Sequence, residues 1–197
     1  WARSPQGEAG IVCQDCHMPQ ESGEIAGSRY AAYASHRLLE NRRPEALARA
    51  IALDLQLDSA VVQRGKELRA TAGVTNVGAG HEVPSGDPAH RLELRISIEG
   101  PKGGRPRGAK PASLWLGREV DSAPPFLESG SSSLRPGARR SVDFRFTPSK
   151  RDRAGEWTLV VEAYWWSVPP ERLTELNLSK DQASRRVIER RIPVDVR

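Results

Sequence analysis

The chain has 197 residues and a formal net charge of +5, with 38% apolar and 28% charged residues. This length suits one main domain with a smaller appended part, and the 17 glycines and 15 prolines favour a loop-rich, strand-rich fold over a helical bundle. No apolar run is long enough for a membrane-spanning helix, so we expect no membrane span. Arginines alternate with acidic residues, which is typical of a solvated surface, and no motif indicates nucleic-acid binding.

The first 50 residues differ in composition from the rest of the chain. They contain Cys13-Gln14-Asp15-Cys16-His17, then a polar stretch rich in glycine and serine, then a stretch of short helical character over 30–50. Proline is tolerated at the first position of a helix, so we expect a helix to begin near Pro44. This part has too few apolar residues to form a core of its own. We therefore predict that residues 1–50 form a small irregular and helical segment whose core is a bound cofactor.

From residue 51 onward, apolar residues alternate with polar ones, which is the pattern of half-buried strands. The apolar members of these sets are Ile51, Leu53, Leu55 and Leu57; Leu68, Ala70, Ala72 and Val74; Leu92, Leu94, Ile96 and Ile98; and Val142, Phe144 and Phe146. A longer apolar strand is predicted over 157–166, a helical insertion over 170–176, and a last strand over 187–196, in which Pro193 indicates an edge position. Residues 51–197 are thus predicted to form an immunoglobulin-like antiparallel β-sandwich, and the fold class is mainly β.

The pattern C-x-x-C-H at 13–17 indicates covalent attachment of haem. Two thiols form thioethers with the vinyl groups of a haem, and a histidine directly after the second thiol reaches the iron from one face of the ring. A zinc site would need a second pair of ligands, and a thioredoxin-like motif would need a βαβ context, but the sequence indicates neither. We predict one haem c held by Cys13 and Cys16, with His17 as the proximal iron ligand.

The ligand on the opposite face of the iron is left open between two histidines. Met18, the only methionine, directly follows His17 and could not reach that face. His36 lies in a short segment that could fold over the haem, and His81 lies in a loop whose glycines let the backbone approach a flat ligand. His90 begins a predicted strand and is expected to be a surface residue. Either His36 or His81 would give a bis-His iron, with a lower potential than a His/Met iron.

Three segments resemble the terminal part of a family of multihaem c-type cytochromes. They are C-Q-D-C-H-M-P at 13–19, S-H-R at 35–37 and V-T-N-V-G-A-G-H-E-V-P-S-G-D-P at 74–88. Proteins of that family carry several C-x-x-C-H sites, followed by a β-rich C-terminal domain that opens with an N-x-G-A-G-H-x-x-P-T-G-like loop. This chain differs in having Ser85 where threonine is usual, and in having one haem motif where the family has several.

The resemblance implies an electron-transfer subunit that works within a larger assembly of haem-bearing chains or redox proteins. The chain offers two spare histidines for one iron, so His36 or His81 is a candidate for ligating a haem of another chain. Because haem c is attached outside the cytoplasm, we expect a periplasmic or extracellular protein, with its export signal removed before Trp1. Two alternatives stay open: a haem enzyme with an open iron site for a small nitrogen or sulfur compound, and a structural subunit of a cytochrome complex or filament.

Overall fold

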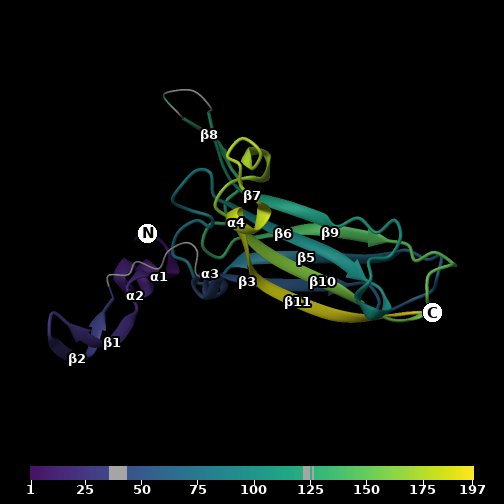
Figure 1. Ribbon diagram of the computed structural model, residues 1–197, viewed down its shortest axis with the longest axis horizontal. Coiled ribbons are helices and arrows are strands. Elements are labelled where there is room, and N and C mark those ends of the chain that lie inside the picture. The colour runs from purple at the N-terminus through teal and green to yellow at the C-terminus, as the bar shows by residue number, and fades with distance from the viewer. Residues whose placement is uncertain (36–43, 122–124, 126) are drawn as a thin grey trace.

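The structure is a computed structural model that describes residues 1–35, 44–121, 125 and 127–197. Its larger part consists of two β-sheets packed face to face, and a smaller N-terminal part lies at one end of these sheets (Figure 1). The predicted fold class, mainly β with a sandwich as the main body, is confirmed. The predicted ligand His36 lies outside the described residues.

In the described part of the chain, the two sheets of the sandwich have three and six strands. The smaller sheet has the order β3-β5-β9, with β3 (Ile51–Leu57), β5 (Leu68–Asn76) and β9 (Arg139–Phe146). The larger sheet has the order β4-β11-β10-β6-β7-β8, with β4 (Val61–Val62), β6 (Arg91–Glu99), β7 (Ala112–Val120), β8 (Glu128–Ser131), β10 (Gly155–Trp166) and β11 (Ser184–Val196). The run β11-β10-β6-β7-β8 follows the order G-F-C-C′-C″ of a variable-type immunoglobulin domain, so the sandwich is immunoglobulin-like.

Strand β4 departs from the purely antiparallel arrangement that the sequence predicts. It pairs in parallel with the end of β11, where Val61 is opposite Asp195 and Val62 is opposite Val196. The prediction is wrong at this edge because a two-residue strand is too short to show an alternating pattern. Pairing with β4 begins only after Pro193, so the residue without an N–H lies before the paired stretch, as its predicted edge position requires.

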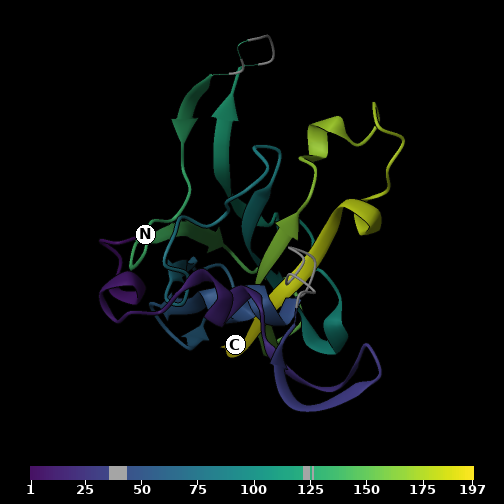
Figure 2. The ribbon, with the colours of Figure 1, turned by 90° about the vertical axis from the view of Figure 1, so that its left-hand side faces the viewer.

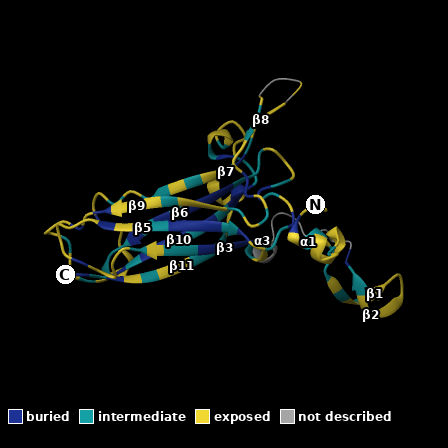
Figure 3. Ribbon diagram, turned by 180° about the vertical axis from the view of Figure 1, so that it is seen from behind, coloured by how far each residue is buried: buried dark blue, intermediate teal, exposed yellow. Residues whose placement is uncertain are grey.

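The predicted alternating residues form the interior of the sandwich. On β6 and β10, the side chains of Leu94, Ile96, Leu159 and Val161 are completely buried. Figure 3 shows the buried residues gathered along the strands of the two sheets. Burying one aliphatic side chain of this size contributes about 1.5–3 kcal/mol. The sandwich therefore has a core of its own, and it offers a rigid base for the loops at its ends.

The N-terminal part contains two short helices and a hairpin, and it projects from the end of the sandwich (Figures 1 and 3). Its elements are α1 (Pro5–Glu8), α2 (Cys13–His17), β1 (Gln20–Ile25) and β2 (Ser28–Ala34). Ala26 and Gly27 have φ angles of 49° and 79°, the positive pair that a type I′ hairpin turn requires. No residue of β1 or β2 is buried, so this hairpin adds little to any core.

Of the helical character predicted over 30–50, the part at 30–34 is wrong and the part at 44–50 is confirmed, while residues 36–43 lie outside the described residues. Residues 30–34 belong to β2, because the turn before this strand pairs them with β1. Helix α3 (Pro44–Ala50) begins at Pro44 as predicted, and it leads directly into β3. The described residues also form η1 (Pro101–Gly103), η2 (Pro170–Arg172) and α4 (Lys180–Ala183). None of the helices in the described ranges is long and apolar enough to cross a membrane.

Three consecutive aromatic residues at the end of β10 divide between the two faces of the larger sheet, because side chains alternate along a strand. On the outer face, the indole Nε1 of Trp166 donates a hydrogen bond to the carboxylate of Glu93 at 3.1 Å. The hydroxyl of Tyr164 donates to Glu162 at 2.8 Å, and burial together with this bond raises the pKa of Tyr164 to about 12. Trp165 faces the opposite way and belongs to the core cluster.

Candidate haem-binding site

The predicted attachment motif forms the five-residue helix α2. The carboxylate of Asp15 accepts a hydrogen bond from the backbone N–H of Val12 at 2.8 Å, which stabilises the start of this helix. Residues three and four apart are neighbours on a helix surface, so Cys16 and His17 both lie beside Cys13. Both cysteines are free thiols, and all three side chains are exposed. The helix thus presents two thiols and an imidazole toward one space.

The loop that carries His81 follows β5 and is organised by the buried side chain of Asn76. The Nδ2 of Asn76 donates to the carbonyl oxygens of His81 at 2.8 Å and of Leu134 at 3.0 Å. Its Oδ1 accepts the backbone N–H of Ala79 at 3.0 Å. After the histidine, Val83 and Leu134 exchange two backbone hydrogen bonds that close the loop. The N–H of Val83 donates to the carbonyl of Leu134 at 3.0 Å, and the N–H of Leu134 donates to the carbonyl of Val83 at 2.7 Å. The side chain of Asn76, which is only 1% exposed, therefore fixes the backbone of His81.

The glycines of this loop allow close contact with other parts of the protein. The N–H groups of Val77 and Gly78 both donate to the carbonyl of Ala50, at 2.9 and 3.1 Å, and a Cβ on Gly78 would lie 2.1 Å from the carbonyl oxygen of Arg49. A Cβ on Gly80 would lie 2.2 Å from the indole ring of Trp1. Within the described part of the chain, Gly78 approaches the end of α3 and Gly80 approaches an aromatic side chain, while the approach to a flat ligand stays a prediction.

Replacing Gly78 with alanine is expected to lower the free energy of unfolding by about 1–3 kcal/mol, because the added carbon forces the loop away from α3. Gly104 provides the matched control, since its φ is −74° and a Cβ there would meet nothing within 4 Å. We expect Gly104→Ala to change stability by less than about 1 kcal/mol. Urea denaturation measures both variants, and equal effects would contradict the close contact at Gly78.

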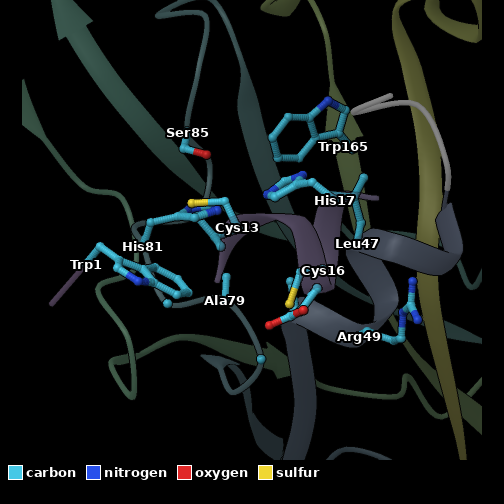
Figure 4. A pocket seen from close by; sticks show the side chains of 15 residues that line it. Trp1, Cys13, Cys16, His17, Leu47, Arg49, Ala79, His81, Ser85 and Trp165 are labelled. Carbon is cyan, nitrogen blue, oxygen red and sulfur yellow. The ribbon is translucent and has the colours of Figure 1, made fainter. Parts of the chain in front are cut away.

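A pocket of about 250 Å³ lies between α2, α3 and the loop after β5 (Figure 4). Figure 2 shows the N-terminal segment crossing in front of this end of the sandwich. The walls of the pocket are largely apolar and come from Trp1, Leu47, Ala79, Val83 and Trp165. The side chains of α2 also line it, together with His81, Arg49 and Ser85. An apolar pocket with a few polar groups is the usual form of a cofactor site.

His17 and His81 reach the pocket from different elements, and Figure 4 shows their rings close together. Their ring centroids are 6.0 Å apart, and the ring planes differ by 18°. A histidine nitrogen lies about 2 Å from a transition metal that it binds, and the ring centroid lies about 1 Å further away. Two histidines on opposite faces of one ion would therefore have centroids about 6 Å apart. The separation in the structure fits the axial pair of a haem iron.

The backbone also determines which nitrogen of His81 is available. The Nδ1 of His81 lies 2.8 Å from the carbonyl oxygen of Glu82. A carbonyl oxygen can only accept a hydrogen bond, so Nδ1 carries the proton and Nε2 keeps a lone pair. Histidines that bind metals commonly donate from their second nitrogen in this way, which fixes both the tautomer and the orientation of the ring.

Of the two remaining histidines, His90 and His36, the structure describes His90 alone. The Nδ1 of His90 lies 3.1 Å from the carbonyl oxygen of Ser85, and its ring packs on Trp165 with centroids 5.0 Å apart. His90 therefore has a structural role, whereas His36 lies outside the described residues. The sequence analysis missed Leu47 and the other pocket walls, because their apolar character alone indicates only burial.

The described residues do not form a metal site from protein side chains alone. Among them, no group of three or more His, Cys, Asp and Glu side chains could hold a metal ion. A structural zinc ion needs four such ligands, whereas a haem iron takes its axial ligands from the protein and its other four from the porphyrin. Two thiols and two facing imidazoles fit haem better than zinc.

Known proteins resemble this chain in fold but not detectably in sequence. No family model matches the sequence, and no curated protein matches it. In fold, the chain is similar to a penta-haem cytochrome c552 from Thermochromatium tepidum, with a TM-score of 0.66 and 19% identity, over 97% of this chain and 52% of that chain. A CARDB domain from Pyrococcus furiosus gives a TM-score of 0.40 and 16% identity, over 75% of this chain and 87% of that one. The chain thus shares its fold with part of the penta-haem protein and spans about half the length of that protein.

Proposed function

We propose that the chain is a c-type cytochrome that transfers single electrons through one covalently bound haem. The observation that carries this proposal is the pair His17 and His81, whose 6.0 Å centroid separation fits two ligands on opposite faces of one iron. Cys13 and Cys16 would form the thioethers, and the bound haem would supply a one-electron Fe(III)/Fe(II) couple. With a histidine on each face, the iron would have no open position for a substrate, and this would favour electron transfer over an enzymatic role.

The pocket supports electron transfer in two ways. Its apolar walls would shield one part of the porphyrin from water, and the hydrogen-bonded loop would hold His81 in place in both oxidation states. The cysteines, in contrast, are exposed. The haem edge that they hold would therefore lie near the surface, where an electron can pass to a partner.

We further propose that the chain works beside other haem-bearing chains or redox proteins. Two observations support this: the chain has a single C-x-x-C-H motif, and it spans about half the length of the similar penta-haem cytochrome. Since His81 faces His17 of the same chain, ligation of a haem on another chain would fall to His36. Because haem c is attached outside the cytoplasm, the proposed place of action is periplasmic or extracellular.

Export of the chain in a host with a c-type haem maturation system tests the proposal. We expect one covalent haem per chain, measured by intact mass and by the absorption of the denatured protein. The double variant Cys13→Ala and Cys16→Ala should carry no covalent haem, while His90→Ala should carry as much as the wild type. Wild-type protein that carries zinc and no haem would contradict the proposal.

A further inference from the structure

The end of the sandwich away from the pocket carries the positive charge of the protein. Three connecting segments lie at this end, at 58–67, 100–111 and 147–154, and Figure 1 shows this end beside the C-terminus. These segments form the basic end. Together they contain nine lysine and arginine residues and three aspartate and glutamate residues, a net charge of +6. The whole chain has a net charge of +5, so the rest of the chain is nearly neutral.

Contacts between the three segments hold the basic end together. The N–H of Gly65 donates to the carbonyl of Pro148 at 2.6 Å, which joins the first segment to the third. The indole Nε1 of Trp157 donates to the carbonyl of Arg153 at 2.9 Å, and a Cβ on Gly100 would lie 4.0 Å from the same indole ring. Trp157 therefore joins the second segment to the third. The charges of all three segments belong to one surface.

The cations of the basic end are available to a partner. All nine are exposed, and none of them forms an ion pair with a described residue. Nearby acidic groups are engaged elsewhere: Glu67 pairs with Arg69 of β5, and the carboxylate of Asp152 accepts the N–H of Ser149 at 2.6 Å. Like charges gathered at one end repel one another, and a bound polyanion relieves that repulsion.

The pocket end of the sandwich has the opposite charge. Segments 77–90 and 167–183 lie at this end, because β5 and β10 end there. They contain five aspartate and glutamate residues and two lysine and arginine residues. Charge is thus distributed unevenly along the length of the sandwich. Near an anionic surface, this difference turns the basic end toward that surface.

The distance between the two ends narrows the choice of partner. Strand β10 runs from Gly155 at the basic end to Trp165 in the pocket wall and beyond it. At about 3.3 Å per residue, this part of the strand spans about 33 Å. Electron transfer slows steeply with distance, so an acidic redox protein at the basic end would be too far from the proposed haem. The basic end is therefore suited to attachment and not to electron exchange.

We propose that the basic end binds the surface of a membrane that contains anionic phospholipids. A plane of phosphate groups contacts cations from all three segments at once, and each lysine or arginine near such a surface adds to the affinity. Within the three segments, all of whose residues are described, Val61 is the only large apolar residue that is exposed, so the binding is electrostatic and involves no insertion. No pocket residue takes part, so this inference does not rest on the proposed function.

Cosedimentation of the full chain with lipid vesicles tests the inference. At low ionic strength, the chain should bind vesicles made of equal parts of phosphatidylcholine and phosphatidylglycerol, and it should not bind vesicles of phosphatidylcholine alone. High salt should release it, because the charges are exposed to solvent. The double variant Arg105→Gln and Arg107→Gln should bind the anionic vesicles about 30-fold more weakly, which is the expected loss for two cations near the surface.

The matched control is the double variant Arg3→Gln and Arg29→Gln. It removes the same charge from two exposed arginines of the N-terminal part, so it should bind almost as tightly as the wild type. Equal losses in the two double variants would overturn the basic end as the contact surface. A wild-type chain that stays in solution with the anionic vesicles would also overturn it, including one that binds polyglutamate and so prefers an acidic protein. Haem attachment is measured separately, so neither result bears on the proposed function.

Discussion

Replacing His81 with alanine in the haem-loaded protein is expected to convert the iron from low-spin to high-spin. The imidazole that lies 6.0 Å from His17 between ring centroids would then be gone, and the axial position that we propose for it would be open. Near-infrared magnetic circular dichroism measures the change, because it distinguishes bis-His iron from five-coordinate or water-bound iron. Added imidazole should restore the low-spin spectrum, since it can occupy the vacated position.

His90→Ala is the matched control for this experiment. His90 bonds to a backbone carbonyl and packs on Trp165, so its loss should leave the iron low-spin even if the protein is less stable. If His81→Ala stays low-spin and His36→Ala becomes high-spin, the axial ligand is His36 and our assignment is wrong. The wild-type protein tests the enzymatic alternative, because a wild-type iron that is already high-spin and binds cyanide would support it.

Replacing Asn76 with alanine is expected to lower the free energy of unfolding by about 3 kcal/mol. The substitution removes three hydrogen bonds and leaves the backbone N–H of the half-buried Ala79 without its acceptor. Because these bonds position His81, we also expect a fraction of the iron to become high-spin well below the melting temperature. Denaturant titration measures the first effect, and the temperature dependence of the haem spectrum measures the second.

Ser184→Ala serves as the control for Asn76→Ala. Ser184 is also buried, and its hydroxyl donates one hydrogen bond to the carbonyl of Lys180 at 3.0 Å, outside the set of residues that line the pocket. Ser184→Ala should lower the free energy of unfolding by about 1 kcal/mol and leave the spin state of the iron unchanged. If the two variants affect the spin state equally, Asn76 acts on stability alone and does not position the iron ligand.

The strands that the sequence predicts best are those with one face in the core. Leu94 and Ile96 show why: each is completely buried, and the alternation that reveals them is a direct result of that burial. Strand β7 was missed because Trp115 lies between Leu114 and Leu116, and an exposed tryptophan hides the alternation. The hairpin β1–β2 was missed because no residue in it is buried, so it has no pattern to detect.

The candidate site was predictable where its chemistry is local. Cys13, Cys16 and His17 are adjacent in sequence, and their spacing alone indicates haem attachment. The position of His81 beside His17 was not predictable, because it depends on contacts between residues far apart in sequence. One of these contacts runs through Asn76 to Leu134, more than fifty residues away along the chain.

The projecting hairpin has a consequence for the topology of the chain. A haem attached at α2 and bound to His81 would cross-link two points that about 60 residues of chain separate, with the hairpin inside the closed ring. By the chain-entropy estimate, a cross-link over that length restricts the unfolded state by about 4 kcal/mol. The cofactor would then attach the N-terminal part, in which almost no residue is buried, to the sandwich, which has its own core. Loss of the bond between iron and His81 would release the N-terminal part while the sandwich stays folded.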